Sequence, residues 1–149
     1  GTENVAGIVG LDAAMRLAVE GRSHRRDHLG QLRRELLENL DIPDLRVNGD
    51  RKVRHSGIIS LTMKNADAAA VYFNLNMMGI TVSKGAACAS GKMEPSHVLS
   101  AIGCSDQEAM NTLRISLGLS NTSDDVRAIL QELPKAMKRP HCKGNVIKV

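Results

Sequence analysis

The sequence predicts an α/β fold of two layers, a sandwich in which a small antiparallel or mixed sheet carries helices packed on one face. Ile59 to Lys64 and Thr112 to Leu117 alternate apolar and polar residues, as half-buried strands do. The segment 66–78 is apolar over nearly its whole surface, as expected for a helix buried against a sheet. Tight turns between neighbouring segments favour antiparallel pairing of the strands.

The first 40 residues have the apolar spacing of a helix. Apolar residues recur at Val5, Ile8, Val9, Met15 and Leu17, and again at Leu29, Leu32, Leu36 and Leu40. Their three-and-four spacing predicts one long linking helix over residues 1–40. The stretch from Gly21 to His28 is polar on every side, so we expect it to cross solvent or line an interface. His24 and His28 share a helix face and could bind a metal ion, but no third ligand is near in sequence, and two solvated histidines are the simpler interpretation.

Turn residues divide the next part of the chain into short elements. In order, we expect a turn at 41–44, a strand at 45–47, a turn at 48–50, the strand at 59–64, the helix at 66–78 and a strand at 80–83. Asn65 is the expected N-cap of the helix, and Gly79 closes it. The last strand leads directly into a segment of small residues, 83–94.

That segment is built around a single thiol, Cys88. Gly85 and Gly91 bracket it, so we expect a mobile loop that presents the cysteine. Lys84 and Lys92 favour the thiolate form. Cysteine is also among the most buried residue types, so the residues alone leave a structural role open.

After the loop we expect two short helices, a strand and a last helix. The short helices cover 95–102 and 106–110, and Cys104, between them, is most simply a structural thiol. In the strand 112–117, Arg114 lies on the polar face. Thr122 and Asp125 form a capping box for the last helix, which Pro134 is expected to kink or end. Residues 139–149 are a basic tail.

Composition limits the classes of function. The chain has 149 residues, one domain by length, with aromatic residues at 1% and a formal net charge of +4. Basic side chains with so few aromatics are better explained as solvated helix faces than as a nucleic-acid interface, so no nucleic-acid partner is expected. No apolar run reaches the roughly 18 residues of a membrane span, and there is no signal-peptide pattern.

Three cysteines without paired spacing favour a reducing compartment, and we expect a cytoplasmic protein. The first residue is Gly rather than Met, which suggests a truncated or processed chain.

Three motifs, in order, resemble one enzyme family. The run GAACASGKMEPSHVL resembles the active-site loop of pyridoxal-phosphate-dependent cysteine desulfurases, in the class-V aminotransferase group with a long cysteine loop. The opening GTENVAGIVGL and the segment LRISLG resemble two further parts of the same family. The resemblance covers nearly all of the chain, which looks like the last two-fifths of such an enzyme. It implies the small C-terminal domain of fold-type I pyridoxal enzymes at 41–138, carrying the loop at 83–94, with the helix at 1–40 joining it to a large domain that this chain lacks.

The resemblance also implies an activity and roles for three residues. Cysteine desulfurases convert L-cysteine to L-alanine and carry the sulfur as a persulfide to an iron–sulfur scaffold or another acceptor protein. Cys88 matches the cysteine that takes the sulfur, and Arg114 matches the arginine that binds the substrate carboxylate. Thr2 matches the threonine that reaches the cofactor phosphate of the neighbouring subunit in a homodimer.

The chain also departs from the family. The Schiff-base lysine of the Ser-x-His-Lys motif is absent, so we expect this chain alone neither to hold pyridoxal phosphate nor to turn over cysteine. Two alternatives on the same fold are a selenocysteine lyase and a cysteine-sulfinate desulfinase. A third is a non-catalytic module that binds a sulfur acceptor or a metal. Four residues could be drawn as metal ligands, namely Cys88, His97, Cys104 and Cys142. Without a Cys-x-x-Cys pair no resident metal is expected, and an iron–sulfur cluster held transiently at Cys88 rests on family analogy alone.

Overall fold

The computed structural model describes residues 1–50, 53–84 and 95–139 and contains a four-stranded antiparallel sheet. The strands are β1 (Leu45–Val47), β2 (Ile58–Met63), β3 (Ser83–Lys84) and β4 (Thr112–Ser116), in the order β1-β2-β4-β3. All three strand pairs are antiparallel. The sheet therefore places β4 between the first hairpin and the strand that leads into the cysteine segment.

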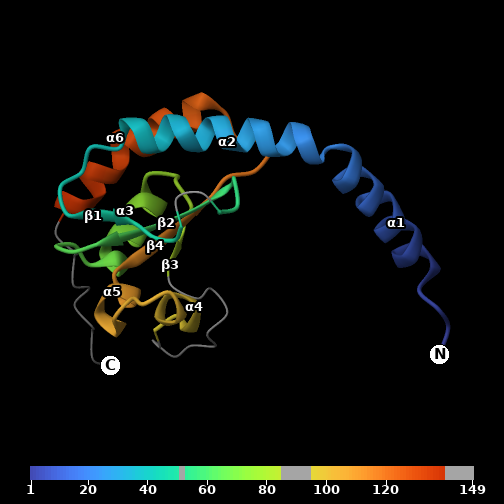
Figure 1. Ribbon diagram of the computed structural model, residues 1–149, viewed down its shortest axis with the longest axis horizontal. Helices are drawn as coiled ribbons and strands as arrows, with labels where there is room; N and C mark the ends of the chain where they lie inside the picture. The colour runs from blue at the N-terminus through green and yellow to red at the C-terminus, as the bar shows by residue number, and fades with distance from the viewer. Residues whose placement is uncertain (51–52, 85–94, 140–149) are drawn as a thin grey trace, which may run out of the picture.

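Three helices cover the apolar face of this sheet. They are α2 (Arg22–Asn39), α3 (Ala68–Met77) and α6 (Ser123–Lys138). Figure 1 shows α2 and α6 lying side by side over the sheet, and α3 contacts both α6 and the β3–β4 edge. The core beneath them is aliphatic, and its largest fully buried members are Leu36, Ile59, Leu61, Met63, Leu75, Leu113 and Leu133. The expected two-layer α/β sandwich is confirmed for the sheet and these three helices; the two remaining short helices lie on the other face.

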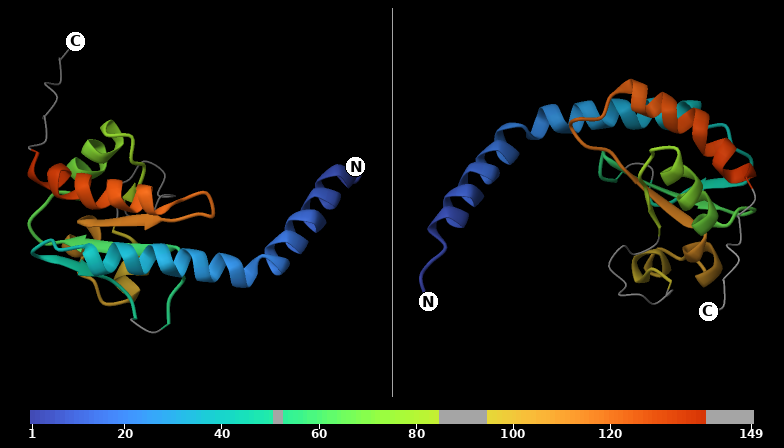
Figure 2. Two further views of the ribbon diagram at one scale, coloured as in Figure 1. Left: turned by 90° about the horizontal axis from the view of Figure 1, so that it is seen from above. Right: turned by 180° about the vertical axis from the view of Figure 1, so that it is seen from behind.

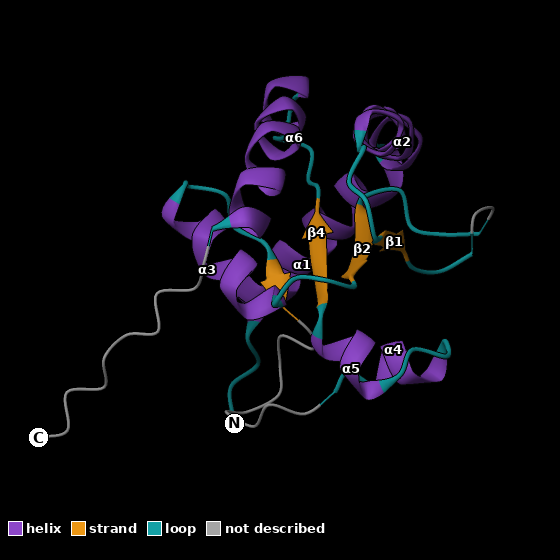
Figure 3. Ribbon diagram, turned by 90° about the vertical axis from the view of Figure 1, so that its left-hand side faces the viewer, coloured by secondary structure: helices purple, strands orange, loops and turns teal. Residues whose placement is uncertain are grey.

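Two short helices lie on the opposite, polar side of the sheet. They are α4 (His97–Ala101) and α5 (Asp106–Met110), and Figure 3 shows them on the side away from α2 and α6. Leu99, Cys104 and Ala109 form a small buried cluster of their own between them. The polar face is thus partly covered, which leaves a hollow between α4 and the strands.

The helix expected over 1–40 is present as two helices that meet at Gly21. The first is α1 (Val5–Glu20), whose last turn ends where the Gly21 amide donates to the Leu17 carbonyl at 3.0 Å. A glycine at the end of a helix readily allows such a change of direction. Figure 2 shows α1 extending away from the sheet, and none of its residues is buried. By contrast, Leu29, Leu32 and Leu36 place α2 in the core.

Several local expectations differ from the structure. The strand expected at 80–83 is observed as β3, at Ser83–Lys84. The N-cap of α3 is Asp67 rather than Asn65: the Asp67 carboxylate accepts from the Ala69 amide at 2.8 Å, while Asn65 donates to Asp44 at 2.6 Å. Pro134 does not end the last helix, because α6 continues to Lys138. Asn74 on α3 donates to the Ala136 carbonyl at 2.9 Å, which holds the turn after the proline against the domain. The capping box of Thr122 and Asp125 is confirmed.

Candidate active-site cleft

Arg114 lies in the middle of the polar face of the sheet. Leu113 and Ile115 on either side of it are buried in the core, so strand alternation directs Arg114 to the other face. There it is paired across the sheet with Ser60 of β2 and Ser83 of β3. Arg114 therefore lies on the polar face of the sheet, as expected.

The guanidinium of Arg114 has a hydrogen-bond donor without an acceptor among the described residues. Its Nη2 donates to Ser83 Oγ at 3.4 Å. Its Nε is buried and has no hydrogen-bond partner among the residues that the structure describes. A buried donor without a partner costs free energy, and a carboxylate that accepts from a guanidinium at two points would remove that cost.

A cleft of about 510 Å³ opens beside Arg114, between the sheet and α4. Its apolar lining includes Val47, Ile58, Val98, Leu99 and Ile102. Its polar lining includes Asn48, Arg54, Ser60, His97 and Arg114. A mainly apolar hollow with a few convergent polar groups is the usual form of a small-molecule site, and Arg114 gives this one an anion-binding end.

Hydrogen bonds between hydroxyl and amide groups hold the sheet side of the cleft. Thr62 and Thr112 lie opposite each other, and their Oγ1 atoms are 2.7 Å apart. Asn48 donates to Thr62 Oγ1 at 2.7 Å and to Ser60 Oγ at 3.1 Å. These bonds cross from β4 to the end of β1, so the strand that carries Arg114 is fixed relative to its neighbours.

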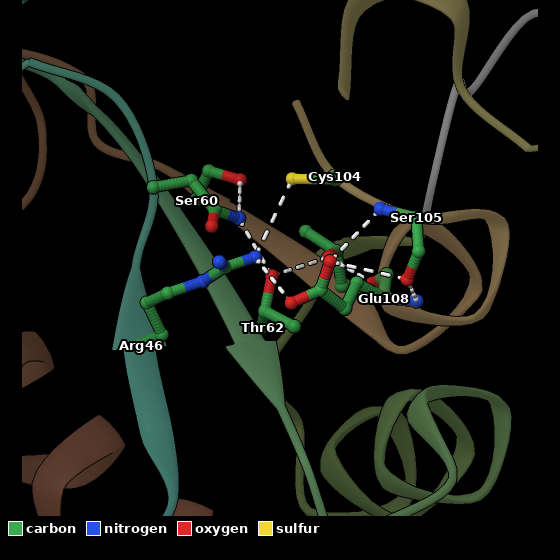
Figure 4. A network of polar contacts seen from close by, with 8 residues as sticks. Arg46, Ser60, Thr62, Cys104, Ser105 and Glu108 are labelled. Atoms are coloured by element: carbon green, nitrogen blue, oxygen red, sulfur yellow. Dashed lines mark hydrogen bonds and ion pairs between the residues drawn. The ribbon is translucent and has the colours of Figure 1, made fainter. Parts of the chain in front are cut away.

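A second network attaches α5 to the sheet, as Figure 4 shows. Arg46 of β1 reaches Glu108 Oε1 at 2.9 Å and Cys104 Sγ at 3.5 Å. The Ser105 amide donates to Glu108 Oε2 at 2.8 Å, as half of a capping box. Hydrogen bonds from the Ser105 amide and hydroxyl, followed by the charge of Arg46, lower the pKa of the Glu108 carboxyl. Cys104 is a buried free thiol within this network, which fits the structural role expected for it.

The cysteine segment starts beside Arg114. Ser83 and Lys84 pair with Arg114 and Leu113, so the backbone enters residues 85–94 from the strand next to the guanidinium. The chain returns at Ser96, which is buried and lines the cleft. Cys88 itself lies outside the described residues.

The other candidate residues lie at different distances from the cleft. Thr2 is exposed, ahead of α1, and Figure 1 places this end of the chain far from the sheet, so the structure does not bring Thr2 and Arg114 together. His97 is the first residue of α4 and lines the cleft. No group of three metal-binding side chains occurs in the described ranges. His24 and His28 stack with ring centroids 6.2 Å apart, and His28 Nε2 lies 3.0 Å from the Asn121 carbonyl oxygen.

Ser83 and Asn48 were not identified from the sequence as parts of the site. Ser83 belonged to the expected loop without a role of its own, and Asn48 was expected only as a turn residue. The alternating polar residues Ser60, Thr62 and Arg114 were the available signal, because they mark one sheet face. Which residues lie opposite them depends on strand register, which the sequence pattern alone leaves open.

Comparison with known proteins identifies the family. The model of the class-V aminotransferases matches residues 1–129. The chain belongs to the class-V aminotransferase family. It is 38% identical over 142 residues to a protein named cysteine desulfurase IscS from Clostridium botulinum, covering 93% of this chain and 36% of that protein. A protein of the same name from Methanosarcina thermophila is 39% identical over 140 residues, covering 93% of this chain and 35% of the relative.

A solved structure has a similar fold. A NifS-like protein from Rickettsia africae superposes with a TM-score of 0.79 at 28% identity, over 91% of this chain and 35% of that one. The chain thus spans about a third of the length of the relatives that it matches. No helix in the part of the chain that the structure describes is long and apolar enough to cross a bilayer.

Proposed function

We propose that the protein containing this chain is a cysteine desulfurase, which releases L-alanine from L-cysteine and passes the sulfur to an acceptor as a persulfide. The observation that carries the proposal is the pairing of Arg114 with the strand that leads into the cysteine segment. The names of the relatives at 38–39% identity support the same activity.

Arg114 is proposed to bind the carboxylate of the substrate. Its unpartnered Nε and its Nη groups form a planar fork that suits a carboxylate, and Ser83 limits the rotation of that fork. The substrate would then lie in the cleft with its remaining atoms toward α4. Arginine at this position acts by binding and orientation rather than by proton transfer.

Cys88 is proposed to accept the sulfur. Its thiolate attacks the substrate sulfur, so that an S–S bond forms while the C–S bond of the substrate breaks. The electron pair of the C–S bond stays with the substrate carbon, which takes up a proton to become the methyl group of alanine. In sequence it follows Lys84 by four residues, which ties it to the strand beside Arg114. A cysteine tethered there is suited to meet a substrate held by that arginine.

The family implies dependence on pyridoxal phosphate, but the described residues do not fit as its holder. No lysine is among the described residues that line the cleft, so they provide no amine for a Schiff base. Thr2, expected to reach the cofactor phosphate of the neighbouring subunit, belongs to the N-terminal end of the chain, which Figure 1 shows away from the sheet, so it adds no phosphate contact beside Arg114 of its own chain. We therefore propose that the cofactor is held by another part of the protein, and that this chain alone is inactive.

The surface of α1 supports a link to that other part. Its large apolar side chains are 60–74% exposed: Val5, Ile8, Val9, Leu11, Met15, Leu17 and Val19. A helix that is apolar over most of its surface is normally covered by protein. We propose that α1 packs on the large domain, or on the second subunit of a homodimer, and that residues 41–138 form the small domain. A cytoplasmic location and an iron–sulfur scaffold as acceptor are proposed as well.

The test uses the full-length protein with its cofactor. With L-cysteine as substrate we expect equimolar alanine and persulfide sulfur, and Cys88→Ser should abolish alanine formation while the cofactor stays bound. Continued turnover by Cys88→Ser would mean that another thiol carries the sulfur. Exclusive turnover of selenocysteine or cysteine sulfinate would favour the related enzymes on this fold, and a protein without any turnover would favour the acceptor-binding module.

A further inference from the structure

Arginine side chains gather where α2 meets the β1–β2 connection. Arg26, Arg33 and Arg34 of α2 line a cavity of about 390 Å³, together with Ser56 of the connection. Arg33 also lines a neighbouring cavity of about 700 Å³, in which it is joined by Arg54. Arg33 therefore stands between the two cavities, with a cationic side chain on each side of it.

Two of these arginines, Arg33 and Arg34, lack anionic partners among the described residues. The Nε of Arg33 is buried and has no hydrogen-bond partner in the described part of the chain. Neither Arg33 nor Arg34 takes part in an ion pair with a described carboxylate. Burial, and then the charge of Arg54, lower the pKa of Arg33, so the two guanidinium groups are close enough to repel each other. As it stands, the arrangement is electrostatically unfavourable.

The nearby carboxylates are already engaged. Asp27, which lines the smaller cavity, pairs with Arg26 at 3.5 Å. Asp44, which lines the larger one, accepts from Asn65. Arg54 is held by donating to the backbone carbonyls of Asp50 and Gly49. No nearby described carboxylate therefore neutralises the positive charge of Arg33 and Arg34.

A glycine lines the smaller cavity. Gly30 lies in the middle of α2, where glycine is a poor helix former, and it lines the cavity. A Cβ at this position would lie 3.6 Å from an Nη atom of Arg34. The absence of a side chain therefore leaves room next to the guanidinium groups.

We propose that this arginine cluster (Arg26, Arg33, Arg34 and Arg54) binds a small polyvalent oxyanion of the phosphate class, with Arg33 at its centre. Planar guanidinium groups bind phosphate oxygens at two points each, and such an anion supplies the acceptor that Arg33 Nε lacks. A di- or trianion matches two unpaired arginines better than a single carboxylate does. The centre of the site is distinct from the substrate position, because Arg33 and Arg34 do not line the cleft beside Arg114, whereas Arg54 lines both that cleft and the larger cavity.

The test is calorimetric titration of the full-length protein with inorganic phosphate, pyrophosphate and ATP at low ionic strength. We expect saturable binding of pyrophosphate, accompanied by an increase in Tm. Arg34→Gln, at an exposed position, should weaken binding about 10-fold, as expected for loss of a hydrogen bond to a charged group. Arg33→Gln should weaken it at least as much. Tighter binding of ATP than of pyrophosphate would identify a nucleotide as the source of the phosphate.

Two controls keep the proposal open to disproof. Arg127→Gln removes the same charge from α6, where Arg127 pairs with Asp124 and lines neither cavity, and should leave binding within about 2-fold. Gly30→Glu places a carboxylate in the cavity and should reduce binding without removing any arginine. The proposal is overturned if millimolar pyrophosphate gives neither heat nor a Tm shift, or if Arg127→Gln weakens binding as much as Arg34→Gln does.

Discussion

Arg114 and Ser83 face each other across the β3–β4 pair, with the arginine Nη2 3.4 Å from the serine Oγ. Ser83 is followed by Lys84 and then by the segment that contains Cys88. The residue proposed to bind substrate therefore contacts the strand from which the proposed sulfur acceptor extends. A substitution at either position should therefore change the affinity for the substrate.

The first prediction concerns the shape of the guanidinium. Arg114→Lys in the full-length enzyme should lower kcat/KM for L-cysteine about 10- to 100-fold, because an ammonium keeps the charge but loses two-point binding of the carboxylate. Ser83→Ala should raise KM by a smaller factor, since it removes only the contact that orients the arginine. Steady-state kinetics of the two single variants and the double variant give the coupling between them. Strictly additive effects would show that Ser83 does not act through Arg114.

The second prediction concerns acid stability. Hydrogen bonds from Ser105 lower the pKa of Glu108, and those from Thr122 and Asn121 lower the pKa of Asp125. A carboxyl group with a lowered folded-state pKa stabilises the fold above its unfolded pKa, about 4, and that stabilisation is lost as the pH falls through the folded value.

Glu108→Gln and Asp125→Asn should therefore lower Tm near pH 7, and the difference from wild type should shrink as the pH falls below about 4. Thermal unfolding followed by circular dichroism between pH 3 and pH 7 measures this. Glu38→Gln, at an exposed position on α2, is the matched control. A Tm difference for Glu108→Gln that does not change with pH would contradict the proposed cause.

Much of the fold could be predicted because local patterns determine it. Alternation in β2 and β4 identified the two central strands and the face that carries Arg114, and the Thr122–Asp125 spacing identified the start of α6. Long-range relations could not be read in this way. The contacts of Arg46 with Cys104 and Glu108 join residues 58 or more positions apart and exist only once β1 is in register.

The incorrect or incomplete local expectations share one cause, which is tertiary packing. Asn65 and Asp67 are both good N-caps by type, and the hydrogen bond of Asn65 to Asp44 decides between them. Pro134 is tolerated because the following turn is held by Asn74 and by buried Ala136. At Gly21, the same three-and-four apolar spacing before and after a polar stretch concealed the boundary between a helix packed in the core and one with no buried residue.

The third prediction tests which helix belongs to the core. Leu36 of α2 is fully buried, so Leu36→Ala should reduce the free energy of unfolding by about 2–5 kcal/mol. Val19→Ala, at a residue 74% exposed on α1, should change it by less than about 0.5 kcal/mol if α1 is uncovered in the molecule measured. Urea denaturation of this chain and its two variants gives both values. Equal losses would show that α1 is buried in solution.

The last prediction concerns what covers α1. Ile8, Leu11, Met15 and Val19 follow one another at intervals of three or four residues and form a single exposed apolar stripe. Leu11→Arg places a charge in the middle of that stripe. In this chain alone the exposed side chain should tolerate the change, with Tm altered by only a few degrees. If α1 packs as proposed in the full-length protein, the arginine would be buried against an apolar surface, so we expect a large fall in Tm or loss of the proposed dimer in analytical ultracentrifugation. Glu20→Arg, at the exposed end of the same helix, introduces an arginine outside the stripe and should cause neither. A full-length Leu11→Arg protein with the stability and mass of wild type would show that α1 remains uncovered, and would remove the support that this helix gives to a large domain packed on it.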